Sequence, residues 1–278
     1  MPTAERPQPY RAIVSLEQTK RRISLLAVQD PPVFQVRPPV GPSPWFLTAD
    51  HAGRWLPRTL GSLGLSDQAL ASHIAWDIGV SGLAEQLAER LDAFLITQTY
   101  SRLVIDCNRP PGTPESIVTW SERTPIPGNE HLSRAAAQAR EREIFHPYHH
   151  RIGREIDVRQ QAGQLTLLVA LHSFTPRFMG VDRPWHAGVL YHRDARLSRL
   201  LLGLLRADEG GWMVGDNEPY SISDDTDYTV LVHGERRAIP HVELEIRQDL
   251  IATAAGQAAW AARLARLLGQ AAAALSPR

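Results

Sequence analysis

The stretch LTLLVALHS, residues 165–173, decides the fold class of this 278-residue chain. Its first seven residues, Leu165–Leu171, are almost continuously apolar and form the strongest strand prediction in the sequence. Such a run is typical of a strand that is buried on both faces of a sheet, as in parallel sheets covered by helices. An imidazole, that of His172, follows directly on this apolar run, and Ser173 comes next.

Strands and helices alternate on both sides of this stretch. Further strands are predicted at Trp45–Ala49, Phe94–Thr99, Gly188–Tyr191 and Val242–Ile246. Helices are predicted at residues 67–73, 78–91, 131–161 with a break at Pro147, 193–207 and 250–274. This alternation predicts an α/β fold with a mostly parallel sheet that helices cover on both faces. In such folds the ligand crevice lies at the carboxyl ends of the strands.

The two ends of the chain suggest one domain with an extension. Prolines punctuate the first forty residues, and we expect residues 1–32 to form an N-terminal arm and residues 33–278 to form a single catalytic domain. The first residues lack the apolar core of a secretory signal, and no segment has the roughly 18 consecutive apolar residues that span a bilayer. We therefore expect a cytoplasmic protein with no membrane partner.

The composition excludes several classes of function. Thirty basic residues balance thirty acidic ones, so no excess of positive charge favours a nucleic-acid partner. Cys107 is the single cysteine, which rules out an intramolecular disulfide and a zinc site built from cysteines. Any metal must therefore be held by Asp, Glu or the eleven His. Lys20 is the single lysine, and its place near the N-terminus argues against a Schiff-base or general-base lysine.

Ionisable side chains gather where three predicted strands end. Asp50 and His51 follow the first strand, His172 follows the second, and Glu243 and Glu245 lie in the last. One strand-end histidine is more often a structural group, but two with a carboxylate favour a metal or catalytic site. Zinc-dependent hydrolysis needs three protein ligands, a water and a carboxylate that takes its proton. No HExxH, GxSxG, Walker A or dinucleotide-binding motif is present.

Seven segments together resemble the N-formylglutamate amidohydrolase family. They are DHAG (50–53), HIAWDIG (73–79), SRLVIDCNRP (101–110), LHSFTP (171–176), RPW (183–185), NEPY (217–220) and EIR (245–247). The resemblance implies a zinc-carboxypeptidase-like, three-layer α/β/α fold. It also implies a zinc-dependent hydrolase whose substrate is a small N-acyl amino acid similar to N-formylglutamate.

The resemblance further implies roles for individual residues. His51 and His172 match metal ligands, Glu245 matches the general base, and Arg109 matches a group that stabilises oxyanion charge. The residues expected to contact the substrate are Arg102, Asn108, Ser173, Arg183, Asn217, Tyr220 and Arg247.

The third metal ligand departs from the carboxypeptidase pattern. Carboxypeptidases have a glutamate three residues after the first histidine, and here that position is Arg54, which cannot bind zinc. Asp77 is our prediction for the missing ligand, because it belongs to one of the shared motifs and opens a predicted helix. Asp50 is the alternative, although strand alternation points it away from His51.

Two other functions stay open at this point. The chain could be a metal-free or inactive relative that binds acidic metabolites through its arginines. It could also be a zinc peptidase, or a deacylase of another N-acyl amino acid. Metal content separates the first of these alternatives from the hydrolase.

Overall fold

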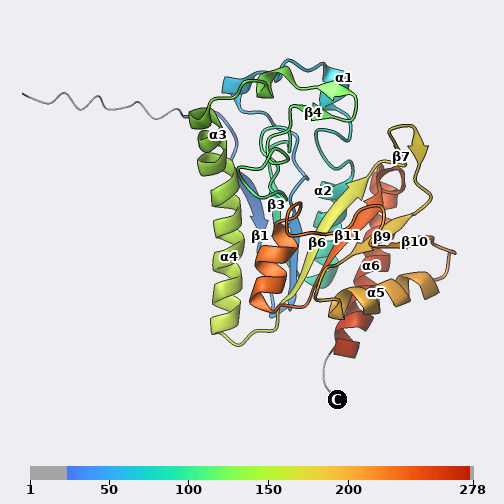
Figure 1. Ribbon diagram of the computed structural model, residues 1–278. Coiled ribbons are helices and arrows are strands. Elements are labelled where there is room, and N and C mark those ends of the chain that lie inside the picture. Colours follow the sequence, from blue (N-terminus) through green and yellow to red (C-terminus); the bar gives the residue numbers. More distant parts are fainter. Residues whose placement is uncertain (1–23, 276–278) are drawn as a thin grey trace, which may run out of the picture.

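The computed structural model describes residues 24–275 and has the predicted α/β architecture, a mixed sheet between two layers of helices (Figure 1). The seven strands have the order β1-β3-β2-β6-β11-β9-β10. Their bounds are β1 Phe34–Arg37, β2 Trp45–Ala49, β3 Phe94–Gln98, β6 Leu167–Phe174, β9 Ala187–Leu190, β10 Val214–Asp216 and β11 His241–Arg247. The central strands β3, β2, β6 and β11 are parallel, whereas β1 and β9 run antiparallel to their neighbours β3 and β11.

The two helical layers bury alternate residues of the strands. On one face lie α2 (Val80–Leu91), α5 (Arg196–Ala207) and α6 (Ala254–Leu275), and on the other lies α4 (His146–Gln161) (Figure 1). Leu167, Val169 and Leu171 of β6 pack into the core of the first layer, and Leu168 packs into the core on the α4 side. Because side chains alternate along a strand, His172 points to the same side of the sheet as Leu168.

Three details differ from the sequence-based expectation. Strand β6 continues to Phe174, so His172 and Ser173 lie within a hydrogen-bonded strand rather than after it. Short strands β1 and β10 were not predicted, because edge strands of only three or four residues carry little apolar signal.

The predicted helix break at Pro147 is wrong. Helix α3 (Arg134–Arg140) runs through a π-helical turn, Glu141–Phe145, directly into α4. Pro147 lies in the first turn of α4, where the wider turn before it accommodates the missing N–H and the ring.

Most of the predicted N-terminal arm, residues 1–23, lies outside the described residues. Its last part packs on the domain: Leu25 is buried, and the backbone N–H groups of Leu25 and Leu26 donate to the carboxylate of Glu143. Among residues 24–275, none of the helices combines the length and hydrophobicity that crossing a bilayer requires.

Two small hairpins lie beyond the carboxyl edge of the parallel strands (Figure 1). One joins β4 (Trp120–Ser121) to β5 (Thr124–Pro125), and the other joins β7 (Arg177–Phe178) to β8 (Val181–Asp182). Short helix α1 (Asp67–Leu70) lies at the same end of the molecule (Figure 1). These segments surround the edge of the sheet at which the predicted site residues meet.

Candidate active site

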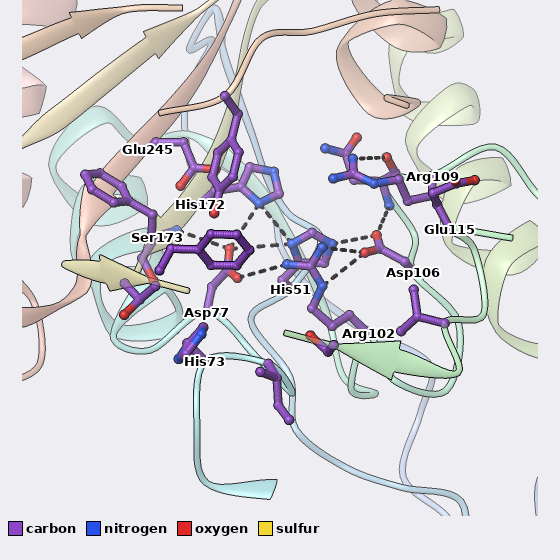
Figure 2. Close-up of a pocket in the computed structure, with 18 of the residues that line it drawn as sticks. His51, His73, Asp77, Arg102, Asp106, Arg109, Glu115, His172, Ser173 and Glu245 are labelled. Atoms are coloured by element: carbon purple, nitrogen blue, oxygen red, sulfur yellow. Dashed lines mark hydrogen bonds and ion pairs between the residues drawn. The ribbon is translucent and has the colours of Figure 1, made fainter. Parts of the chain in front are cut away.

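A cavity of about 260 Å³ lies at the carboxyl ends of β2, β6 and β11. Glu245 of β11 is the register partner of His172 on β6, and His51 follows the end of the neighbouring strand β2. The sheet therefore brings these three residues to one edge, as the carboxyl-end argument predicts. Figure 2 shows them with the loop residues that complete the cavity wall.

Three buried donor atoms converge at the floor of the cavity. The Nδ1 atoms of His51 and His172 are 3.1 Å apart, and Oδ2 of Asp77 lies 3.5 Å from the first and 3.0 Å from the second (Figure 2). Asp77 comes from the loop before α2, and its Oδ2 also accepts a hydrogen bond from the backbone N–H of Ser173. In the described part of the chain, this is the one group of three or more His, Cys, Asp or Glu residues that could hold a metal ion.

The second nitrogen of each imidazole faces a carboxylate. Nε2 of His51 lies 2.7 Å from Oδ1 of Asp106, and Nε2 of His172 lies 3.7 Å from Oδ2 of Asp50. Asp50 is in turn held by the hydroxyl of Tyr148 on α4, which donates to Oδ1 at 2.6 Å. The Nε2 atoms therefore face carboxylates on the outside of the cluster, whereas the Nδ1 atoms face Asp77 and each other.

The surroundings of this cluster favour positive charge. Two imidazole nitrogens and a carboxylate oxygen meet there. Burial alone would raise the pKa of Asp77, but the adjacent His51 and His172 lower it. Burial opposes charge on His172, yet the surrounding carboxylates, Glu243 first among them, raise its pKa well above the usual range. Two imidazole nitrogens and a carboxylate oxygen form a donor set that suits zinc, with the cavity on the remaining side.

Glu245 stands next to this cluster with a free carboxylate oxygen. The residue is buried, and among the described residues its Oε2 has no hydrogen-bond partner. Burial raises the pKa of Glu245 to about 8. Its register neighbour on β9 is Gly188, where a Cβ atom would meet the backbone oxygen of Glu218 at 2.1 Å. A larger residue would therefore push away the loop that leads to Tyr220.

A second glutamate of β11 was not assigned a role from the sequence. Glu243 lines the same cavity, accepts a hydrogen bond from Nδ2 of Asn108 at 3.3 Å, and has its pKa raised to about 7 by burial. The alternation of Glu243 and Glu245 within an otherwise apolar strand was the signal that both point to one face.

The two arginines of the cavity wall are both ion-paired. Arg102 donates from Nη2 and Nε to Asp106 at 2.6 and 3.0 Å, and its Nη1 lies 3.7 Å from Asp77 (Figure 2). Arg109 donates to Asp227 at 3.2 Å. Asp106 therefore joins His51 to Arg102.

The remaining predicted substrate contacts divide into two groups. Ser173, Asn108 and Tyr220 line the cavity, and Arg183 donates to the Tyr220 hydroxyl at its mouth. Asn217 and Arg247 do not line it. The Asn217 side chain accepts from the backbone N–H of Tyr191, and Arg247 pairs with Asp249 beyond the end of β11.

Buried histidines behind the site form a separate pair. His149 of α4 is buried. Its Nε2 lies 2.7 Å from the carbonyl oxygen of Cys107 and its Nδ1 lies 3.0 Å from Nε2 of His233. Cys107 is buried, and burial raises its pKa well above the usual range. A buried thiol of this kind is a poor nucleophile.

Comparison with known proteins adds independent information. A model of the N-formylglutamate amidohydrolase family matches residues 43–252. The crystal structure of a gene product from Agrobacterium tumefaciens is 35% identical, with a TM-score of 0.87, over 90% of this chain and 99% of that one. N-formylglutamate amidohydrolase from Ralstonia eutropha JMP134 shares the fold at 20% identity and a TM-score of 0.62, over 87% and 97% of the two chains. No curated protein sequence matches the chain.

Proposed function

The chain belongs to the N-formylglutamate amidohydrolase family, and from this premise we propose that it is a zinc-dependent enzyme that hydrolyses the amide of an N-acyl amino acid. One observation carries the metal dependence. Two imidazole nitrogens and a carboxylate oxygen, from His51, His172 and Asp77, lie within 4.8 Å of one another in a buried cluster. When bound there, zinc would polarise the amide carbonyl and lower the pKa of water.

Glu245 is the residue that would move the proton. Its buried carboxylate has a free oxygen beside the two histidines, and it lines the cavity that a substrate must enter. As general base it takes a proton from the attacking water, and it then gives that proton to the departing nitrogen. Asn108 and Glu243, joined by a hydrogen bond, line the same cavity.

The arginines would stabilise negative charge on the substrate. Arg109 lines the cavity and would stabilise the charge that develops on the amide oxygen, whereas Arg102 contacts the substrate beside Asp77. Arg183, at the cavity mouth, would hold the substrate carboxylate.

The test combines metal analysis with turnover. We expect purified protein to bind one zinc ion and to hydrolyse members of a panel of N-formyl and N-acetyl amino acids, with activity lost to a chelator and restored by zinc. Glu245→Gln should keep the metal and lower kcat by about 10²- to 10⁴-fold.

Each part of the proposal has its own negative result. Normal turnover by Glu245→Gln would show that another group is the base. Protein that takes up no zinc would favour the metal-free binding module, and cleavage of dipeptides instead of N-acyl amino acids would favour a peptidase.

A further inference from the structure

Tyr220 lines the cavity, and the mechanism proposed above gives it no chemical role. It lies in the loop 217–220, which follows directly on β10. Asn217 ties this loop to β9: its backbone N–H donates to the carbonyl oxygen of Val189, and its side chain accepts from the backbone N–H of Tyr191. The loop that carries Tyr220 is therefore held in place at its start.

Two glycines let this loop lie against the strand that carries the general base. A Cβ atom at Gly188 would meet the backbone oxygen of Glu218 at 2.1 Å, and one at Gly215 would meet the same atom at 2.5 Å. The Cβ position at Gly188 is also only 3.3 Å from the Cβ atom of Glu245, its register partner. The loop consequently passes over the face of the sheet to which Glu245 points.

The hydroxyl of Tyr220 accepts a hydrogen bond and keeps its own hydrogen free. Nη1 of Arg183 donates to it at 2.8 Å, and the guanidinium carbon lies 4.7 Å from the centre of the tyrosine ring. Within residues 24–275, no side chain or carbonyl group accepts the hydroxyl hydrogen. The side chain is 41% exposed, so this hydrogen is accessible to a molecule that enters the cavity.

The surroundings of the hydroxyl favour a neutral donor. Burial and the charge of Glu245 raise the pKa of Tyr220, so the phenol stays protonated at neutral pH. Arg102 also acts on this hydroxyl electrostatically, and its Nη1 lies 3.7 Å from Oδ1 of Asp77. Tyr220 is thus within electrostatic reach of both the base and the arginine beside a predicted metal ligand.

We propose that Tyr220 is a further catalytic residue, whose hydroxyl donates a hydrogen bond to the substrate amide oxygen as negative charge develops there, and that Arg183 is the positioning residue that holds this hydroxyl. The proposal rests on the proposed amidohydrolase function. A donor that is oriented before the reaction stabilises developing charge without reorganisation. Tyr220 adds to the stabilisation assigned to Arg109, and the other N–H groups of Arg183 stay available to the substrate carboxylate.

Steady-state kinetics of Tyr220→Phe on the zinc-loaded full-length protein, with N-formylglutamate as substrate, test the proposal. Loss of one donor to the oxyanion lowers kcat by about 10²- to 10³-fold. Because the contact strengthens only in the transition state, KM should stay within about threefold of wild type. An unchanged kcat would overturn the proposal, and so would a higher KM with an unchanged kcat, which indicates binding of the ground state alone.

Tyr191→Phe is the matched control. It removes a phenolic hydroxyl that donates to Asp216 outside the cavity wall, and it should leave kcat and KM unchanged. Zinc titration and melting temperature check that both variants are folded and bind metal as the wild type does.

A double-mutant cycle tests the positioning role of Arg183. Arg183→Gln should lower kcat in the wild-type background, but by no more than about twofold in the Tyr220→Phe background, because its effect on kcat passes through the hydroxyl. An equal fall of kcat in both backgrounds would overturn this role.

Calorimetry separates this inference from the amidohydrolase proposal. The probe is a phosphoramidate analogue of N-formylglutamate, in which tetrahedral phosphorus replaces the amide carbon and carries a charged oxygen. Tyr220→Phe should weaken its binding by about tenfold or more, and Tyr191→Phe should not. If the wild type hydrolyses no N-acyl amino acid, the proposed function fails. Equal binding of the analogue by wild type and Tyr220→Phe, or no binding to either, would overturn the role of Tyr220.

Discussion

Asp106→Asn should weaken metal binding without a change of any predicted ligand. The Asp106 carboxylate accepts from four donors: Nε2 of His51 at 2.7 Å, Nη2 and Nε of Arg102 at 2.6 and 3.0 Å, and the backbone N–H of Asn108 at 2.8 Å. An asparagine offers one acceptor oxygen, and its NH₂ group would face other donors. It cannot hold the imidazole and the guanidinium together.

The size of the expected loss in zinc affinity follows from the contact between Asp106 and His51. Removal of a carboxylate behind a ligating histidine costs about 10- to 100-fold in metal affinity. This loss corresponds to roughly 1.4–2.7 kcal/mol, the difference expected between a charge-assisted hydrogen bond and a weak or missing one. We therefore expect the zinc Kd of Asp106→Asn to rise by about one to two orders of magnitude.

Competition with a chromophoric zinc chelator measures this Kd directly, and circular dichroism checks that the variant is folded. Asp227→Asn is the matched control, because it removes the carboxylate that pairs with Arg109 and leaves both imidazoles untouched. Its Kd should stay within about twofold of wild type. A folded Asp106→Asn protein that binds zinc as tightly as wild type would refute the assignment of the His51 Nδ1 atom as a metal donor.

Three further predictions concern the structure around the site. Tyr148→Phe removes the hydroxyl that donates a hydrogen bond to buried Asp50. The free energy of unfolding, measured by urea titration, should fall by about 1–3 kcal/mol. An unchanged value would mean that another donor replaces the hydroxyl. Burial lowers the pKa of His149 to about 4, from a value near 6.5 in the unfolded chain. Between these pH values only the unfolded chain binds the extra proton, so the free energy of unfolding falls as the pH drops. His149→Gln should reduce that fall by roughly 3 kcal/mol, and a pH profile of stability parallel to that of the wild type would contradict the argument. Gly188→Ala places a methyl group against the carbonyl oxygen of Glu218. This contact should lower the free energy of unfolding by about 1–3 kcal/mol and thus lower the melting temperature. An unchanged melting temperature would show that the loop of Glu218 moves aside without cost.

Local sequence patterns were sufficient for the central strands of the sheet and for three residues at their carboxyl edge. The apolar runs of β2, β6 and β11 predict buried parallel strands because their periodicity is a property of each segment alone. Since parallel strands end at one edge, His51, His172 and Glu245 could be expected together. The same alternation implies that Glu243 shares a face with Glu245, although no role followed from it.

The other components of the site depend on contacts between distant segments. Asp50 and Asp77 were both candidates in the sequence, and only packing distinguishes them: Asp50 points into the α4 layer toward Tyr148, while the loop before α2 turns Asp77 against the two Nδ1 atoms. Asp106 approaches His51 across 55 residues, a relation that no local pattern contains.

The sequence by itself determined the α/β class, the alternation of its main strands and helices and the kind of chemistry its polar strand ends can support, because hydrophobic periodicity and residue type act locally. Tertiary structure decided which nitrogen of each histidine faces inward and which aspartate completes the cluster. These properties depend on distances of about 3 Å between side chains from separate loops, over which hydrogen bonds and ion pairs form.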